Sequence, residues 1–136
     1  MEDVRYGFGV DLPSSPEEAI ERVTAALQAE GFGVLTRIDV HETLRKKLGV
    51  ELPPYVILGA CNPALARAAI AAEPQIGLLL PCNVLVQGRT GGGCTVSVAD
   101  PDAMGGLTGN PGLAGPMADA TARLRRVIGA LAATGS

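Results

Sequence analysis

Residues 55–86 read YVILGACNPALARAAIAAEPQIGLLLPCNVLV, and this stretch decides the fold that we predict. An apolar run, an alanine-rich run and a second apolar run predict a strand, a helix and a strand. The apolar runs are typical of strands that are buried on both faces. Each run ends at a cysteine followed by an asparagine, Cys61-Asn62 and Cys82-Asn83. The chain is organised around this pair of thiols.

The helix between the two strands begins at a strong local signal. Asn62 is a residue type that caps helix N-termini, and Pro63 fits the first helical position because no hydrogen-bonded N–H is needed there. The alanine-rich residues 64–72 continue this helix. Residues 76–86 then predict one long strand with a kink or bulge near Pro81, since proline donates no hydrogen bond to a neighbouring strand.

Two further strands precede this stretch, at residues 4–12 and 32–38, where apolar residues alternate with others. A helix lies between them. Ser15 is its predicted cap and Gly31 ends it, in the left-handed conformation that glycine tolerates. The N-terminal part of the chain therefore predicts a strand, a helix and a strand.

A second capping box follows at Asp39, which is followed three residues later by Glu42. It predicts a short helix that is closed by Gly49 and directs Leu44 and Leu48 inward. The Asp39 carboxylate is therefore interpreted first as a helix cap.

The C-terminal third begins with a predicted strand at residues 94–98, which forms a hairpin with the preceding strand across three glycines. Residues 105–115 are rich in Gly and Pro and predict little regular structure. Residues 116–131 predict the last helix from a helical apolar stripe. The whole pattern predicts a single domain over residues 1–136, an α+β two-layer sandwich of a mainly antiparallel sheet with helices packed on it.

Composition narrows the function classes. Hydrophobic residues make up 47% of the 136 residues but aromatic residues only 3%, so little side-chain surface is available for stacking on bases. The net charge of -3 also argues against a nucleic-acid partner. An acidic N-terminus with no apolar run after it predicts no signal peptide, and no run is long enough to span a bilayer. We therefore expect a cytoplasmic protein with no membrane partner.

The two thiols are the first candidates for chemistry. Cys61 precedes a capped helix, whose N-terminal N–H groups and dipole favour an anion such as a thiolate. Cys82 shares a strand face with Val84 and Val86 by alternation, and it approaches Cys61 if the two strands are neighbours. The spacing fits neither a CxxC motif nor a zinc finger. The alternative is that both cysteines pack as small apolar core residues.

Several residues around the thiols are weaker candidates. His41 is the only histidine, so a Cys-His-Asp nucleophilic set would have to combine Cys61 or Cys82 with His41 and Asp39. The alternative interpretation of His41 is that it is an exposed polar residue without a role in a site.

The other candidates would line a ligand site beside the thiols: Asn62, Asn83, Pro63 and Pro81. The segment 105–115 is either a mobile surface loop or a glycine-hinged lid over that site.

The order of motifs resembles the DUF302 family over nearly the whole chain. The matching segments are residues 31–35, 38–40, 44–48, 54–63, 80–86 and 100–101 with Met104. The words GACNP (59–63) and PCN (81–83) are the most specific of them. This resemblance implies the compact α+β fold called TT1751-like, and it implies no activity, because the family is one of unknown function. It favours a site at the two cysteines over core packing.

Three hypotheses remain. The first is a thiol site at Cys61 and Cys82 that handles redox equivalents, sulfur or a soft metal such as Cu(I). The second is a non-enzymatic module that binds a small molecule or a partner, in which the cysteines are structural. The third is a self-associating domain, a homodimer, although no interface is visible in the sequence. The sequence names no reaction and no cofactor, and it leaves open whether the protein is an enzyme.

Overall fold

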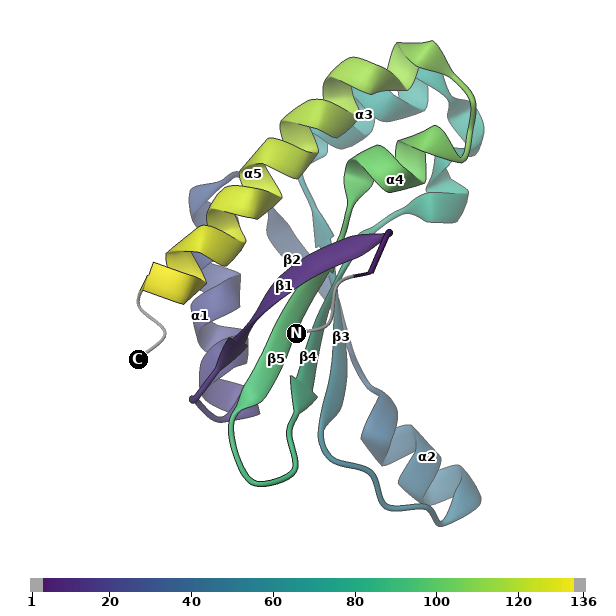
Figure 1. The fold of residues 1–136 in the computed structure, drawn as a ribbon. Helices are drawn as coiled ribbons and strands as arrows, with labels where there is room; N and C mark the ends of the chain where they lie inside the picture. Colours follow the sequence, from purple (N-terminus) through teal and green to yellow (C-terminus); the bar gives the residue numbers. More distant parts are fainter. Residues whose placement is uncertain (1–3, 134–136) are drawn as a thin grey trace.

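A computed structural model describes residues 4–133, and this part of the chain forms a five-stranded antiparallel sheet with helices packed on it (Figure 1). The strands are β1 (Gly7–Leu12), β2 (Gly33–Asp39), β3 (Tyr55–Cys61), β4 (Cys82–Gly88) and β5 (Cys94–Ala99). The helices are α1 (Pro16–Ala29), α2 (Val40–Leu48), α3 (Pro63–Ala72), α4 (Pro101–Gly106) and α5 (Ala114–Ala133), with short 3-10 helices η1 (Pro74–Leu79) and η2 (Pro111–Leu113). The predicted α+β class is confirmed.

The strand order is β1-β5-β4-β3-β2, and every neighbouring pair is antiparallel. β3 and β4 are therefore direct neighbours, as the thiol hypothesis requires. Gly91, Gly92 and Gly93 connect β4 to β5, and all three have positive φ angles that side chains rarely adopt. This turn explains why the hairpin predicted at the three glycines forms.

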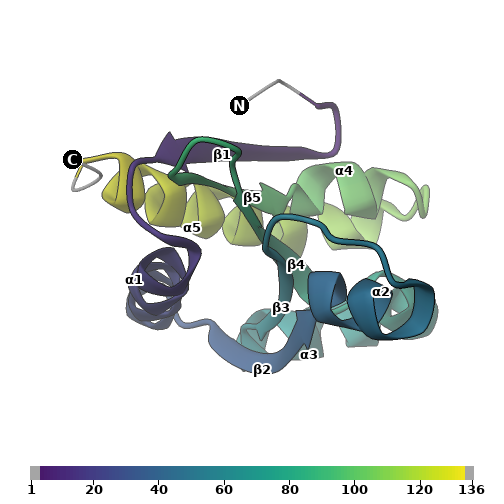
Figure 2. The same ribbon diagram turned by 90° about the horizontal axis from the view of Figure 1, so that it is seen from below.

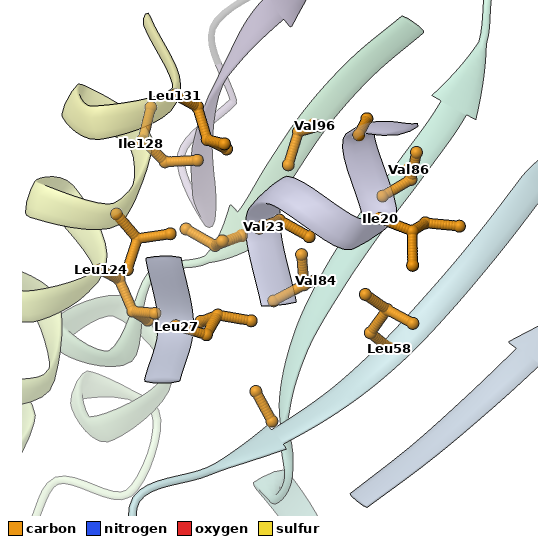
Figure 3. Packing of buried hydrophobic residues seen from close by; sticks show 14 of the residues in the cluster. Ile20, Val23, Leu27, Leu58, Val84, Val86, Val96, Leu124, Ile128 and Leu131 are labelled. Atoms are coloured by element: carbon orange, nitrogen blue, oxygen red, sulfur yellow. The ribbon is translucent and has the colours of Figure 1, made fainter. Parts of the chain in front are cut away.

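One face of the sheet carries the core. The sheet contributes residues such as Leu58, Val84 and Val96, and α1 and α5 cover them (Figure 3). Each such fully buried aliphatic side chain stabilises the fold by roughly 1.5–3 kcal/mol. The labelled helix residues of this core are Ile20, Val23, Leu27, Leu124, Ile128 and Leu131. The aromatic-poor composition is thus accommodated by a core of branched aliphatic side chains.

The short helix α2 lies on the other side of the sheet from α1 (Figure 2). None of its residues is fully buried. Leu44 is half-buried but Leu48 is 69% exposed, so the prediction that Leu48 turns inward was wrong. The predicted capping box is also wrong in part. Asp39 is the N-cap residue, but its side chain makes no capping bond, because the carboxylate accepts hydrogen bonds from Arg37 instead.

The segment before β4 departs from the prediction of one long strand over residues 76–86. Pro74 starts the 3-10 helix η1, and β4 begins only at Cys82. The two prolines explain this, since Pro74 fits the first turn of a helix and Pro81 donates no hydrogen bond to a neighbouring strand.

The glycine-rich segment 105–115 is more regular than predicted. Asp100 caps α4 by accepting a hydrogen bond from the backbone N–H of Asp102 at 3.0 Å. Asn110 caps η2 in the same way through Gly112, at 2.8 Å. Both caps are followed by proline, which is the signal that correctly predicted the start of α3, and α5 then begins at residue 114 instead of 116.

Candidate functional site

The two thiols lie at adjacent strand ends. β3 ends at Cys61 and β4 begins at Cys82, which is opposite Ala60 in the strand register. Cys82 lies on the core face, in line with the buried Val84 and Val86, as the alternation predicted. The structure therefore brings the two cysteines together at one end of the sheet, where α3, α4 and one end of α5 gather (Figure 1).

Both cysteines line one small cavity of about 30 Å³, which is large enough for one water or one ion. Its walls come from β3, β4, α3 and α5, together with Phe32 and Leu80. Apart from the cysteines and Asn62, the lining residues are apolar: Phe32, Ala60, Leu65, Ala66, Ala69, Leu80, Met117 and Ala120. None of the described residues around this cavity is charged, so the sulfur atoms are the main donors that it offers to a ligand.

The protonation of Cys82 follows from these surroundings. Burial raises the pKa of its thiol, and the nearby Cys61 raises it further, from 9.0 to about 11. Desolvation disfavours a thiolate, and a second negative charge beside it does so again. Cys82 is therefore a neutral thiol at pH 7. Cys61, Cys82 and Cys94 are all free thiols in this structure.

Cys94 is not part of this pair. It is fully buried at the start of β5, opposite Gly88 at the far end of β4 from Cys82. Burial also raises the pKa of its thiol. It packs in the main core with Leu12 and Val96, which is the role that its alternation with apolar residues indicated.

Asn62 holds the end of β3 in place. Its side-chain oxygen accepts a hydrogen bond from the backbone N–H of Leu65 at 3.2 Å, which caps α3 as predicted. Its amide nitrogen donates to the carbonyl of Glu30 at 3.5 Å, and Arg123 donates to the same carbonyl at 3.0 Å. Pro63 is the first residue of α3. The Asn62 amide thus joins the end of α1 to the start of α3, and it positions the neighbouring Cys61.

A second cavity of about 60 Å³ is also lined by Cys82. Pro81 and the exposed Asn83 line it together with Met104 and Met117. Both predicted lining residues, Pro81 and Asn83, are therefore beside Cys82, but they do not line the cavity that the two thiols share.

The Cys-His-Asp set is not assembled, and this interpretation of the sequence was wrong. In the β2–β3 register Gly33 is opposite Cys61, whereas Asp39 lies six residues further along β2, opposite Val56. At about 3.3 Å per residue this separates Asp39 from the thiol end by roughly 20 Å. His41 lies beyond Asp39, in the first turn of α2.

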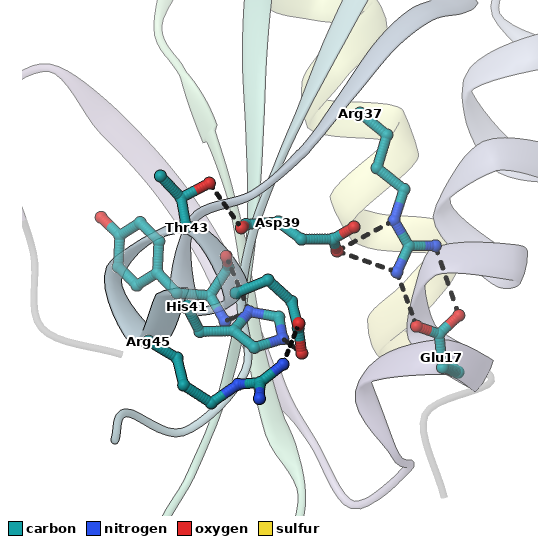
Figure 4. A network of polar contacts seen from close by, with 8 residues as sticks. Glu17, Arg37, Asp39, His41, Thr43 and Arg45 are labelled. Carbon is teal, nitrogen blue, oxygen red and sulfur yellow. Dashed lines mark hydrogen bonds and ion pairs between the residues drawn. The ribbon is translucent and has the colours of Figure 1, made fainter. Parts of the chain in front are cut away.

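Asp39 and His41 have structural partners instead (Figure 4). Arg37 joins Asp39 to Glu17 of α1, with closest contacts of 3.1 Å and 2.7 Å. This guanidinium lowers the pKa of Glu17. Nδ1 of His41 accepts a hydrogen bond from the backbone N–H of Tyr55 at 2.9 Å and so attaches α2 to the start of β3.

A third and larger hollow of about 680 Å³ lies between α4, η2 and α5. Its lining includes Asp102, Asn110, Leu113 and Met117. The segment 105–115, predicted as a loop or a lid, forms much of its wall. Neither Met117 nor Met104 was predicted as a site residue, although Met104 belongs to the family resemblance, because a methionine in an apolar stripe or beside glycines carries no local signal for a site.

Comparison with known proteins places the chain in a defined group. A family model described as "Domain of unknown function DUF302" matches residues 8–131. The crystal structure of an uncharacterized conserved DUF302 protein from Bacillus stearothermophilus superposes with a TM-score of 0.85 at 31% sequence identity, over 93% of this chain and 98% of that one.

Curated relatives are also found. The fluoride-specific ion channels FluC 1 of Brucella suis biovar 1 and FluC 1 of Brucella abortus biovar 1 are each 34% identical over 92 residues, which is 68% of this chain. The match covers 36% and 34% of those proteins, so this chain spans about a third of their length. Among residues 4–133, no helix is both long and apolar enough to cross a membrane.

Proposed function

The chain belongs to the DUF302 family, and we propose that it binds a soft metal ion, represented by Cu(I), between the sulfurs of Cys61 and Cys82. The observation that carries this proposal is that both thiols line one ion-sized cavity whose other walls are almost entirely apolar. The two cysteine sulfurs, at the ends of paired strands, are the only ionisable donor atoms among the described residues that line this cavity. The family itself has no assigned activity.

The donor set favours a soft ion over a hard one. Thiolates select ions such as Cu(I), whereas Mg²⁺ and Ca²⁺ prefer carboxylate, carbonyl and water oxygens. Structural zinc almost always has four ligands. In the described part of the chain, no three His, Cys, Asp or Glu side chains are grouped to hold a metal. An ion that accepts few sulfur ligands therefore fits this cavity best.

The state of Cys82 also bears on the choice between metal binding and thiol exchange. Exchange begins with attack by a thiolate, and the pKa of about 11 leaves Cys82 almost entirely protonated at pH 7. A metal ion can instead displace the proton, because the metal–thiolate bond supplies the free energy. Binding of Cu(I) by Cys82 releases the proton of that thiol, so the affinity for Cu(I) rises with pH.

Anaerobic titration with Cu(I) against a coloured Cu(I) chelator tests the proposal. We expect one equivalent to bind, and Cys61→Ser and Cys82→Ser each to abolish tight binding. Cys94→Ala is the matched control, because Cys94 lies at the other end of the sheet, and it should bind as the wild type does. Equal affinity in the wild type and in the double variant C61S/C82S would exclude the site. Circular dichroism verifies the fold of every variant.

A second candidate function is a small-ligand module in which the cysteines only pack. The hollow of about 680 Å³ between α4 and α5 supports it, because ligand pockets commonly measure roughly 300–1,000 Å³ and combine apolar walls with a few polar groups such as Asp102 and Asn110. A thermal-shift screen that includes fluoride, the ion named for the Brucella relatives, tests it. A ligand that stabilises C61S/C82S as much as the wild type would favour this candidate over the metal site.

A further inference from the structure

Met117 is the residue that connects the three cavities at the thiol end of the sheet. It lies on α5, only 7% exposed, and lines the cavity that holds Cys61 and Cys82. It also lines the second cavity beside Cys82 and the larger hollow under α4. Among the described residues, no other lines all three.

The position of Met117 is fixed by close packing. A β-carbon added at Gly105 would come within 2.6 Å of Cγ and 3.6 Å of Sδ of Met117, so the missing side chain at Gly105 allows α4 to lie directly on the methionine. Met117 also packs with Ala69, Ile76 and Leu113. This packing holds the Met117 side chain against α4, beside the cavity that Cys61 and Cys82 line.

We propose that Met117 is the third ligand of the metal site, so that Cys61, Cys82 and Met117 together bind Cu(I) through three sulfur atoms. This inference rests on the proposed function of the two thiols. It extends that function by adding a neutral thioether to the two thiolates and by assigning the site a metal preference.

The chemistry of a thioether suits this cavity. Two thiolates and one Cu(I) ion carry a net charge of minus one, and the apolar walls already disfavour ionised groups. A neutral sulfur adds a bond to the metal without adding charge. Thioethers are soft donors that select Cu(I), whereas the ligands of protein zinc sites are thiolate, imidazole and carboxylate. The methionine therefore shifts the preference of the site toward Cu(I) and away from Zn²⁺.

Met104 provides a matched control within the same region. It lines the second cavity with Cys82 and Met117, but it does not line the cavity that both thiols share. Met104 is therefore a methionine near the site that is not a proposed ligand, and its replacement can be compared with the replacement of Met117.

X-ray absorption at the copper edge of the Cu(I)-loaded, selenomethionine-labelled protein tests the proposal without altering the packing. We expect a copper–selenium shell in the labelled wild type and in Met104→Leu, and no such shell in Met117→Leu. Chelator competition should show that Met117→Leu lowers Cu(I) affinity by about tenfold or more, as losses around a metal centre commonly do, and that Met104→Leu does not. Leucine replaces methionine in cores with little disturbance.

The outcomes separate this inference from the function on which it rests. If C61S/C82S binds Cu(I) as tightly as the wild type does, the thiol site itself is wrong. If the cysteine variants lose binding but the labelled wild type shows two sulfur neighbours and no selenium, the thiol site stands and Met117 is not a ligand. A Zn²⁺ titration measures the selectivity of the site. The ratio of the affinity for Cu(I) to the affinity for Zn²⁺ should be smaller in M117L than in the wild type. An equal ratio in the two proteins would overturn the assigned metal preference.

Discussion

Pro81 lies directly against Gly59 across the β3–β4 ladder: a β-carbon on Gly59 would come within 2.8 Å of the Pro81 Cγ atom. On the same side it would also collide with the Thr36 hydroxyl oxygen. The close approach of these two residues places the peptide that leads into Cys82 against β3 two residues before Cys61. The thiol pair therefore depends on a glycine that is not itself part of the site.

Gly59→Ala should destabilise the protein by about 1–3 kcal/mol, the usual cost of forcing extra volume into a packed region. The control is Gly33→Ala on the neighbouring strand, where an added β-carbon meets nothing within 4 Å. Urea denaturation followed by circular dichroism measures both. A free energy of unfolding that changes equally in the two variants would contradict the close packing of Gly59 against Pro81 and Thr36.

Asn62→Ala should cost about 1–2 kcal/mol, because it removes the cap of α3 and leaves the Glu30 carbonyl with one donor fewer. Asn83→Ala is the matched control, because Asn83 follows Cys82 as Asn62 follows Cys61. Asn83 is exposed, and surface changes of this kind usually stay within about 0.5 kcal/mol. Chemical denaturation of the two variants gives the comparison, and similar losses would argue against the structural role of Asn62.

Cys82 predicts a stability change at alkaline pH. Its pKa is about 11 in the folded protein against an ordinary 9.0, so the folded state favours the neutral thiol. The contribution of the neutral Cys82 thiol to the free energy of unfolding is complete below pH 9, where this thiol is protonated in both the folded and the unfolded state. It is lost as the pH rises from 9 through 11. Denaturation curves of the wild type and Cys82→Ala over this range should converge as the pH rises. Parallel curves would contradict the raised pKa.

His41→Ala should leave Cu(I) binding unchanged, because His41 lies at the opposite end of the sheet from the thiols. It should lower stability by roughly 1 kcal/mol, since the Tyr55 N–H loses its acceptor and α2 loses an attachment to β3. Chelator competition and thermal unfolding measure the two effects. A loss of metal affinity in this variant would show that the two ends of the sheet communicate.

The sequence predicts local structure well wherever a short signal determines it. Asn62-Pro63 marks the start of α3, and the same pattern of a small polar cap before proline marks α4 and η2 at Asp100 and Asn110. Those two starts were nevertheless missed, because the glycines that follow them suggest a loop. The class of the fold follows from the sum of such signals.

Long-range placement was harder to predict. Asp39 has the sequence of a cap, but Arg37 competes for its carboxylate, and Arg37 is itself held by Glu17 from a different helix. The approach of Cys61 to Cys82 was predictable in part, since it follows from the pairing of β3 with β4. The position of Met117 in the lining of the same cavity was not predictable, because it depends on how α5 crosses the end of the sheet.

The separation of α2 from the thiol end has a practical use. Because α2 projects from one end of the sheet and the cavity of Cys61 and Cys82 lies at the other, a fluorescent label or an immobilisation tag on the exposed side chain of Lys46 would be remote from the two cysteines. An amine-reactive dye on the two exposed lysines of α2, Lys46 and Lys47, would report tumbling or assembly of the protein without modifying the cysteines. The helix α2 thus provides an attachment site for single-molecule and surface-based assays of the proposed metal binding.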